Sequence, residues 1–228
     1  MRHLPANKYN IAWFKLAECV SRGEKERALG VYRLLSHSLE DEAFVYQLEG
    51  DILLAFGDTS GAIQRYAHAL QTYKRDERYV EAAAIVEHIF HITDEKLTYA
   101  HQLVVLYSQL CMHAKAWEYG IYVVRFHRVA GNFDEAIAML DTLVHDDLLE
   151  QSYARKELFF AMIKHGGVSR DIMLAQGNKV VDLMCMLDDH HESQQFFIEL
   201  EIVDVDLYRA LMHEKNEKTC QNTDLNVF

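Results

Sequence analysis

The segment from Tyr46 to Leu70 constrains the fold more than any other part of the sequence, because it has the pattern of two helices joined by a tight turn. Gly57 ends the first helix, since glycine readily takes the left-handed conformation at a helix C-terminus. Thr59 or Ser60 is then expected to cap the second helix. Gly50 lies midway along the first helix, where a small residue allows a second backbone to approach closely. The segment therefore predicts a helical hairpin.

The second helix of this hairpin has a face on which small and large side chains alternate. The residues on this face are spaced by four, three and four positions, as one side of a helix requires: Ala62, Tyr66, Ala69 and Tyr73. A similar stripe begins 34 residues earlier at Ala28, and later stripes begin at Ala82 and Ala136. Ala116 lies 34 residues beyond Ala82. The sequence therefore predicts several hairpins packed side by side.

A helix–turn–helix period of 34 residues, with glycine in the first helix and alanine opening the second, resembles the tetratricopeptide repeat. The residues that match this family are Tyr46 at its large aromatic position, Gly50, Ala62 and Tyr66. The resemblance covers roughly residues 7–146. It implies an all-α fold, an α-solenoid of antiparallel helical hairpins wound into a right-handed superhelix. Tyr46 is then expected to be a buried aromatic of its hairpin.

The regular order of first and second helices is expected to shift near Arg78. The helical run Arg78–His91 has its alanine marker, Ala82, only 20 residues after Ala62, which is too short for a complete repeat. Thr93 and Asp94 are expected to cap the helix that follows. The array is predicted to be one domain, residues 1–146, with three to four degenerate hairpins.

The repeat period fades after Asp146. Residues 147–213 are predicted to form a C-terminal helical segment that caps the array, or else a small separate helical module. Within this segment, helices are expected near Ser169–Gln176 and over Lys179–Leu187. Residues 214–228 are polar and non-periodic, which predicts a mobile tail.

Charge and cysteine content limit the classes of partner and the compartment. The formal net charge of −12 argues against binding nucleic acid or an anionic membrane surface. No run approaches the ~20 apolar residues of a membrane span, and no secretory signal is visible, so no membrane insertion is expected. The four cysteines are far apart without a CxxC motif, which is typical of a reducing compartment, so a cytoplasmic location is predicted.

No motif for catalysis is found, because HExxH, a glycine-rich phosphate loop and GxSxG are all absent. The sequence therefore predicts a protein that is not an enzyme and has no cofactor, metal or catalytic residue. The alternative is a metal-dependent enzyme that uses the acidic and histidine-rich cluster Asp188–Glu192 of the C-terminal segment. His88 and His91, three residues apart on one helix, form a sparser candidate pair.

The resemblance to the tetratricopeptide repeat implies a binding surface. In that family the first helix of each hairpin lines an inner groove, where extended or helical peptides lie. The positions that this implies here are Trp13, Phe14, Phe44, Gln47, Leu48, Asp51, His101, Gln102, Val105, Tyr122, Arg125 and Arg128. Aromatic, amide and charged side chains in this mixture are typical of peptide recognition.

The sequence therefore predicts a scaffold, adaptor or dedicated chaperone that binds a peptide or helix of another protein in this groove. The inner position after Gly50 is Asp51 rather than asparagine, which disfavours the family's carboxylate clamp for chaperone tails. A self-assembling structural protein, which would use the end of the array or its convex face, is the alternative. The formation of a homo-oligomer is therefore kept as an alternative.

Overall fold

The structure is a computed structural model that describes the backbone of residues 6–187 and 190–224. All regular elements in these residues are α-helices, which confirms the predicted all-α fold. The chain divides into two compact units, unit 1 (Met1–Met112) and unit 2 (His113–Phe228).

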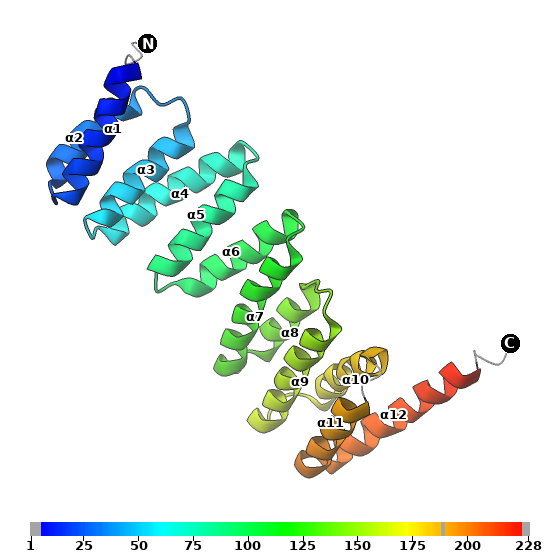
Figure 1. Ribbon diagram of the computed structural model, residues 1–228. Coiled ribbons are helices and arrows are strands. Elements are labelled where there is room, and N and C mark those ends of the chain that lie inside the picture. The colour runs from blue at the N-terminus through cyan, green and yellow to red at the C-terminus, as the bar shows by residue number, and fades with distance from the viewer. Residues whose placement is uncertain (1–5, 188–189, 225–228) are drawn as a thin grey trace. The chain divides into compact units, whose positions relative to one another are not determined.

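Unit 1 is a row of helical hairpins. Its described helices are α1 (Ala6–Ser21), α2 (Lys25–Ser36), α3 (Glu42–Ala55), α4 (Thr59–Arg75), α5 (Tyr79–Ile92) and α6 (Lys96–Gln109). Each helix from α1 to α5 packs against the next one in the chain, and Figure 1 shows consecutive helices running in opposite directions. This succession of hairpins within one unit is the solenoid arrangement that the sequence predicts.

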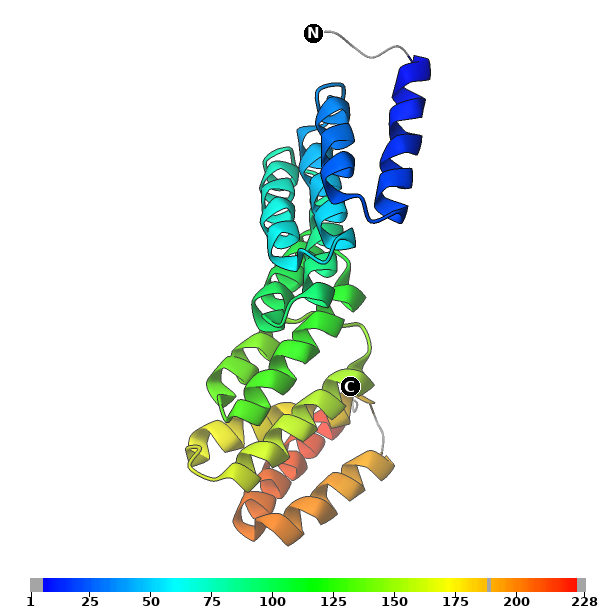
Figure 2. The same cartoon turned by 90° about the vertical axis from the view of Figure 1, so that its left-hand side faces the viewer.

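Unit 2 repeats the same plan. Its described helices are α7 (His113–Ala130), α8 (Phe133–Thr142), α9 (Leu148–His165), α10 (Arg170–Leu187), α11 (His190–Val203) and α12 (Val205–Asp224). The pairs α7–α8, α9–α10 and α11–α12 form the hairpins, and α7 also packs against α9 (Figure 2). The sequence-based boundary after residue 146 lies in the loop between α8 and α9, inside this unit. Whether residues 147–213 act as a cap stays a prediction.

The predicted shift between first and second helices near Arg78 is wrong. Helices α1 to α8 alternate without interruption, so α5 is the first helix of its hairpin and α6 is the second. The alanine positions gave the wrong helix order because such alanines occur in both first and second helices. Ala28 and Ala62 are the fourth residues of second helices, whereas Ala82 and Ala116 are the fourth residues of first helices, and all four are buried.

Gly50 of α3 is required by the ring of Tyr66 in α4. A Cβ atom at Gly50 would lie 2.5 Å from Cε1 of Tyr66, which is too close for two carbon atoms. The expected close approach is therefore confirmed, but an aromatic ring and not a second backbone fills the space. Tyr66 is 0% exposed. Tyr46, expected to be the buried aromatic, is only half-buried and lies against His68, with 5.3 Å between ring centroids.

The helix ends correct two further expectations. The cap of α4 is Asp58, whose carboxylate accepts a hydrogen bond of 3.0 Å from the backbone N–H of Gly61, so Thr59 and Ser60 lie inside the helix. The cap position of α6 is Glu95, which makes no side-chain capping bond, and not Thr93 or Asp94. The position of an N-cap depends on the backbone geometry at the turn. The sequence alone does not fix that position where several polar residues are adjacent.

The C-terminal helices are longer than predicted. Residues 170–187 form the single helix α10, because Gly177 does not break it. A Cβ atom there would lie 2.5 Å from Cδ1 of Leu211 and 3.1 Å from Cε2 of Phe159, so this glycine admits neighbouring helices. Of the expected mobile tail, residues 214–224 belong to α12 and residues 225–228 lie outside the described residues.

We expect Gly50→Ala to lower the free energy of unfolding by about 1–3 kcal/mol, because the added methyl group displaces the buried ring of Tyr66. Gly30→Ala is the matched control, since no atom lies within 4 Å of its added Cβ in α2. The control should be neutral or stabilise by up to about 1 kcal/mol. Urea unfolding followed by circular dichroism measures both, and equal effects of the two variants would refute this packing.

Glu77 joins α4 to α5 with a left-handed backbone, at φ 57°, and Gly57 takes the same region at φ 78° in the preceding turn. A non-glycine residue in this region raises the free energy of the folded state by about 1–2 kcal/mol. Glycine removes that cost, but part of the gain is lost because glycine gives the unfolded state more conformational freedom. We therefore expect Glu77→Gly to raise the free energy of unfolding by up to about 1 kcal/mol. Gly57→Ala should lower it, and thermal melts of the two variants should shift in opposite directions.

Candidate functional site

Two grooves in the structure each lie between the first helices of successive hairpins. The groove of unit 1, called groove 1 here, has a volume of about 310 Å³ and lies between α3 and α5. It is lined by Gln47, Asp51, Glu81, Ala84, Ile85 and His88. Ile85 is buried and forms an apolar floor, while the polar side chains stand on both walls. Groove 1 therefore offers a narrow apolar strip between hydrogen-bonding groups.

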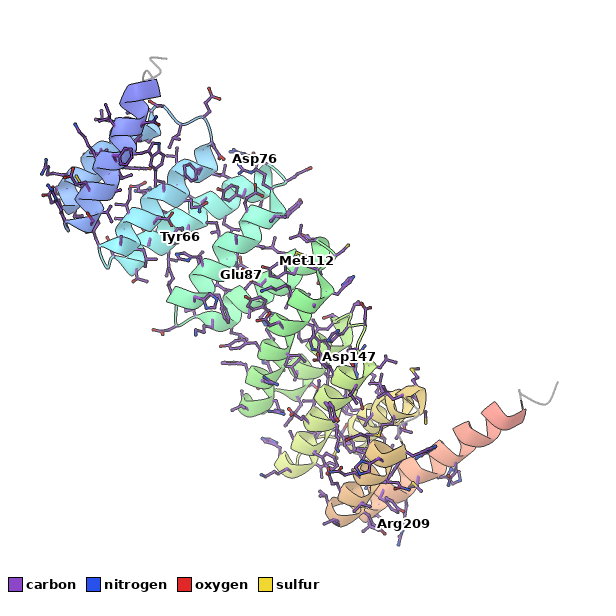
Figure 3. All side chains as sticks on the ribbon, in the orientation of Figure 1. Tyr66, Asp76, Glu87, Met112, Asp147 and Arg209 are labelled. Atoms are coloured by element: carbon purple, nitrogen blue, oxygen red, sulfur yellow. The ribbon has the colours of Figure 1, made fainter. Side chains whose placement is uncertain are left out.

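Two tyrosines of α4 hold the polar side chains of groove 1 in place. The hydroxyl of Tyr66 donates a hydrogen bond of 2.8 Å to Oδ1 of Asp51, and the hydroxyl of Tyr73 donates one of 2.9 Å to Oε1 of Gln47. Figure 3 shows Tyr66 among the packed helices of unit 1. Burial and the neighbouring Asp51 carboxylate raise the pKa of Tyr66, so its hydroxyl stays a donor. Asp51 makes no ion pair within the described residues, which leaves it a negative charge in groove 1.

His88 closes the floor of groove 1 beside the same tyrosine. Its ring meets that of Tyr66 edge to face, with 5.0 Å between centroids and an interplanar angle of 89°. The Nε2 atom of His88 is buried and has no hydrogen-bond partner in the described part of the chain. A buried polar atom without a partner costs free energy.

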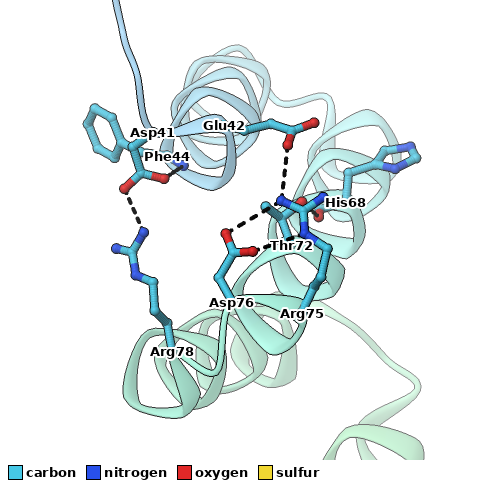
Figure 4. Close-up of polar contacts among 8 residues, drawn as sticks. All are labelled: Asp41, Glu42, Phe44, His68, Thr72, Arg75, Asp76 and Arg78. Atoms are coloured by element: carbon cyan, nitrogen blue, oxygen red, sulfur yellow. Dashed lines mark hydrogen bonds and ion pairs between the residues drawn. The ribbon is translucent and has the colours of Figure 1, made fainter.

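An ion pair ties together the N-termini of the two helices that flank groove 1. Asp41 caps α3 by accepting a hydrogen bond of 3.1 Å from the backbone N–H of Phe44. Its second oxygen pairs with Arg78, the N-cap residue of α5, at 2.7 Å, and Arg78 also bonds Glu81 at 3.0 Å. Figure 4 shows this link beside a second one, in which Arg75 of α4 bonds Glu42 of α3 at 3.2 Å. The Asp41–Arg78 pair therefore links α3 to α5, and the Arg75–Glu42 pair links α3 to α4.

The groove of unit 2, called groove 2, lies between α7 and α9 and has a volume of about 250 Å³. It is lined by Trp117, Ile121, Val124, Arg125, Arg128, Glu150, Tyr153, Ala154 and Glu157. Trp117 and Val124 are buried, and with Ile121 they make an apolar floor. The charged side chains come from both helices and surround that floor.

The charges around groove 2 are unequally paired. Arg128 of α7 forms an ion pair with Glu157 of α9 across the groove. Arg125, one helical turn before, is exposed and makes no ion pair with any residue in the described ranges. At the other end, His145 bonds Glu150 at 2.6 Å and lies 4.5 Å from the Trp117 ring, measured between centroids. Groove 2 therefore presents one unpaired positive charge next to an apolar floor.

The structure brings four of the predicted site residues to the grooves. Gln47 and Asp51 line groove 1, and Arg125 and Arg128 line groove 2. Tyr122 lies on α7 and is half-buried, outside the residues that line groove 2.

The remaining predicted residues of unit 1 lie elsewhere. Leu48 is 9% exposed and belongs to the core of the first two hairpins, so it offers little surface. Phe44 is half-buried, 6.4 Å from the ring of Trp13 between centroids, and Trp13 packs on the same core. Phe14 is 79% exposed on the side of α1 away from this core.

His101, Gln102 and Val105 lie on α6, which is a second helix and lines neither groove. Their selection followed from the wrong helix order after Arg78. The corresponding first helix is α5, whose groove residues Glu81, Ala84, Ile85 and His88 sequence reasoning missed. Their spacing of three or four positions was visible in the sequence and would have identified them once α5 was taken as a first helix. The groove residues of α9 gave no such signal, because the repeat pattern had faded there.

Within the described residues, no group of three or more histidine, cysteine, aspartate or glutamate side chains is arranged to hold a metal ion. Asp188 and Asp189 of the alternative metal cluster lie outside the described residues. Glu192 of that cluster accepts a hydrogen bond from the Tyr153 hydroxyl and lies 3.9 Å from Nζ of Lys156. None of the described helices combines the length and the apolar character needed to cross a bilayer.

No protein-family model and no curated protein matches this chain. Solved structures that match include pilF of Pseudomonas aeruginosa, 15% identical over 90% of this chain and 97% of that chain, with a TM-score of 0.30. A tetratricopeptide repeat protein of Parabacteroides merdae is 14% identical over 92% of this chain and 99% of that chain, with a TM-score of 0.28. A chain of Naa15/Naa10 bound to HypK-THB is 14% identical over 90% of this chain and 38% of that chain, with a TM-score of 0.25.

At TM-scores this low the similarity carries no functional information. The helices themselves define the class: an all-α helical-repeat protein whose hairpins resemble the tetratricopeptide repeat. The resemblance is most direct in α3 and α4, where the ring of Tyr66 fills the space beside Gly50. The right-handed superhelix stays a prediction.

The link between Asp41 and Arg78 makes stability depend on pH. Burial alone would raise the pKa of Asp41, but the hydrogen bonds from Arg78 and the Phe44 N–H outweigh it and lower the pKa. Because the folded pKa lies below the unfolded value of about 3.9, the link stabilises the fold above that pH. Its contribution is lost as the pH falls through the folded pKa.

We therefore expect Asp41→Asn, which keeps the helix cap, to cost at most about 1 kcal/mol at neutral pH, since the carboxylate is partly exposed. The difference from the unmodified protein should shrink as the pH falls through the folded pKa of Asp41 and vanish below it. Urea unfolding at several pH values tests this, and a difference that grows on acidification would contradict it. Asp41→Ala, which also removes the cap, should cost about 1–2 kcal/mol at neutral pH.

Proposed function

We propose that this chain is a protein-binding scaffold that holds a segment of a partner protein in groove 2. The observation that carries this proposal is the combination of an apolar floor, made by Trp117, Ile121 and Val124, with the unpaired charge of Arg125. Small sites of this kind take one or two apolar side chains, and a charged group at the rim fixes their orientation.

The segment that fits groove 2 carries an apolar residue next to a carboxylate. The apolar side chain is buried against Trp117, and the carboxylate pairs with Arg125 in a geometry that a guanidinium group favours. Arg128 already has Glu157 as its partner, so it shapes the wall and leaves recognition to Arg125. This arrangement supports an adaptor more directly than a general chaperone, which needs a wider apolar surface.

Groove 1 supports the same class of function with the opposite charge. Asp51 is held by Tyr66 and makes no ion pair within the described residues, and Gln47 is held by Tyr73. A partner segment with a lysine, an arginine or exposed backbone N–H groups fits these acceptors. His88 lines the floor of groove 1 beside these acceptors.

The thiols fit a reducing compartment, and we place the protein in the cytoplasm on that ground. Cys19, Cys111 and Cys185 are free, and the last two are exposed. Exposed free thiols persist where the environment keeps them reduced. We assign the chain no catalytic step.

Selection from a displayed library of random twelve-residue peptides, followed by fluorescence polarisation on the best binders, tests the proposal. We expect binders that combine a large apolar residue with aspartate or glutamate. Arg125→Glu should weaken their affinity about tenfold or more, which corresponds to about 1.4 kcal/mol. Arg170→Glu is the matched control, because Arg170 is an exposed arginine at the start of α10 and lines neither groove.

A loss of affinity in Arg125→Glu that the control does not share would support groove 2 as the binding site. Binders without acidic residues, or binders whose affinity is the same for both variants, would overturn the assignment. Circular dichroism of each variant should show the helical content of the unmodified protein, since both arginines are exposed.

A further inference from the structure

We propose that chains of this protein associate head to tail, through the outer face of α1 in one copy and the outer face of α11 in the next. The first face, called end face N, is formed by Ile11, Phe14 and Lys15 of α1, with the Glu18–Arg22 ion pair on the same side of the helix. The second, called end face C, is formed by Ile198, Glu201 and Ile202 of α11 with Val203 and Val205 beside them. This inference concerns self-association and does not rest on the grooves.

End face N is an apolar patch on the terminal helix of unit 1. Leu16 and Cys19 turn the inner side of α1 toward the core that it shares with α2. Ile11 and Phe14 are three residues apart, which places them together on the opposite side of the helix. Phe14 is 79% exposed, although a phenylalanine side chain is usually buried. Figure 1 shows α1 at the edge of unit 1, with no helix of that unit on its outer side.

End face C is the corresponding patch in unit 2. Phe196, Phe197 and Leu200 point the inner side of α11 into the core of the unit. Ile198 and Ile202 are four residues apart and lie on the opposite side, and Ile202 is 80% exposed. The exposed Val203 and Val205 extend the patch across the turn from α11 to α12.

The charges of the two terminal hairpins are complementary. Residues 6–36 contain six lysine or arginine residues and three glutamates, whereas residues 190–224 contain three basic and eight acidic residues. Lys15 stands beside Phe14, and Glu201 stands beside Ile202, and neither makes an ion pair with a described residue. Opposite charges favour contact between an end face N and an end face C, whereas two copies of end face C would repel each other. The occupant of each patch is therefore the other end of a second copy.

A contact between two different faces of the same chain is heterologous, so association continues into open chains or closes into a ring. Each patch has the size of one helix face, at the low end of specific interfaces. We therefore expect association at micromolar or higher concentrations, weakened by salt because the terminal charges contribute.

Sedimentation velocity of the full chain, from about 1 µM to about 1 mM, gives the first test. The unmodified protein should form species larger than a dimer as its concentration rises. Phe14→Glu and Ile202→Glu should each stay monomeric, since each destroys one patch at an exposed site that tolerates a charge. Val129→Glu is the control, because Val129 is equally exposed on α7 and belongs to neither patch.

Mixing the two variants gives the decisive result. Phe14→Glu keeps an intact end face C and Ile202→Glu keeps an intact end face N, so an equal mixture should form dimers and nothing larger. Each single charge change, Lys15→Glu or Glu201→Lys, should weaken association, and the double variant should restore it to about the level of the unmodified protein. Simple damage to the fold predicts neither outcome.

Three results would overturn the proposal. A protein that stays monomeric over the whole concentration range has no such contact. Association that Ile202→Glu abolishes but Phe14→Glu leaves intact indicates a symmetric dimer through α11. Association that survives both changes, or that Val129→Glu abolishes as well, places the contact elsewhere on the molecule.

Discussion

The structure of unit 1 depends on the contact between Gly50 and the ring of Tyr66. The ring occupies the space that a side chain on α3 would fill, so α3 and α4 pack closely. Its hydroxyl donates a hydrogen bond to Asp51 of α3, and its ring packs edge to face with that of His88 of α5. One residue thus belongs to the core and also sets two side chains of groove 1. A change that loosens the core therefore also changes the groove.

Unit 2 positions its groove differently. The floor of groove 2 is aromatic and aliphatic, and the walls are joined by the ion pair of Arg128 with Glu157 between α7 and α9. Buried alanines near the start of the helices, such as Ala116 and Ala136, allow the close helix contacts behind that floor. In both units the first helices contribute one side to the core and present another side to the groove.

A helix end could be predicted where it is encoded locally, as at Gly57, which takes a left-handed backbone after α3. What the sequence could not reveal depends on contacts between distant residues. Gly177 has the signature of a helix break, yet it is kept inside α10 because Leu211, 34 residues later, packs against it. Gln47 and Asp51 could be placed on a groove wall because they belong to the best-matched repeat. His88 could not, since its role requires knowing that α5 lies beside α3.

The unpaired charges of the two grooves have opposite signs, Asp51 in groove 1 and Arg125 in groove 2. Under the proposed function, a partner segment whose charge suits one groove would be repelled by the other, so two different partners would not compete for one site. The protein would then be bivalent and selective at each groove. Because that selectivity would come from single residues on a regular helical framework, reversing one charge would change the preferred partner and leave the framework intact.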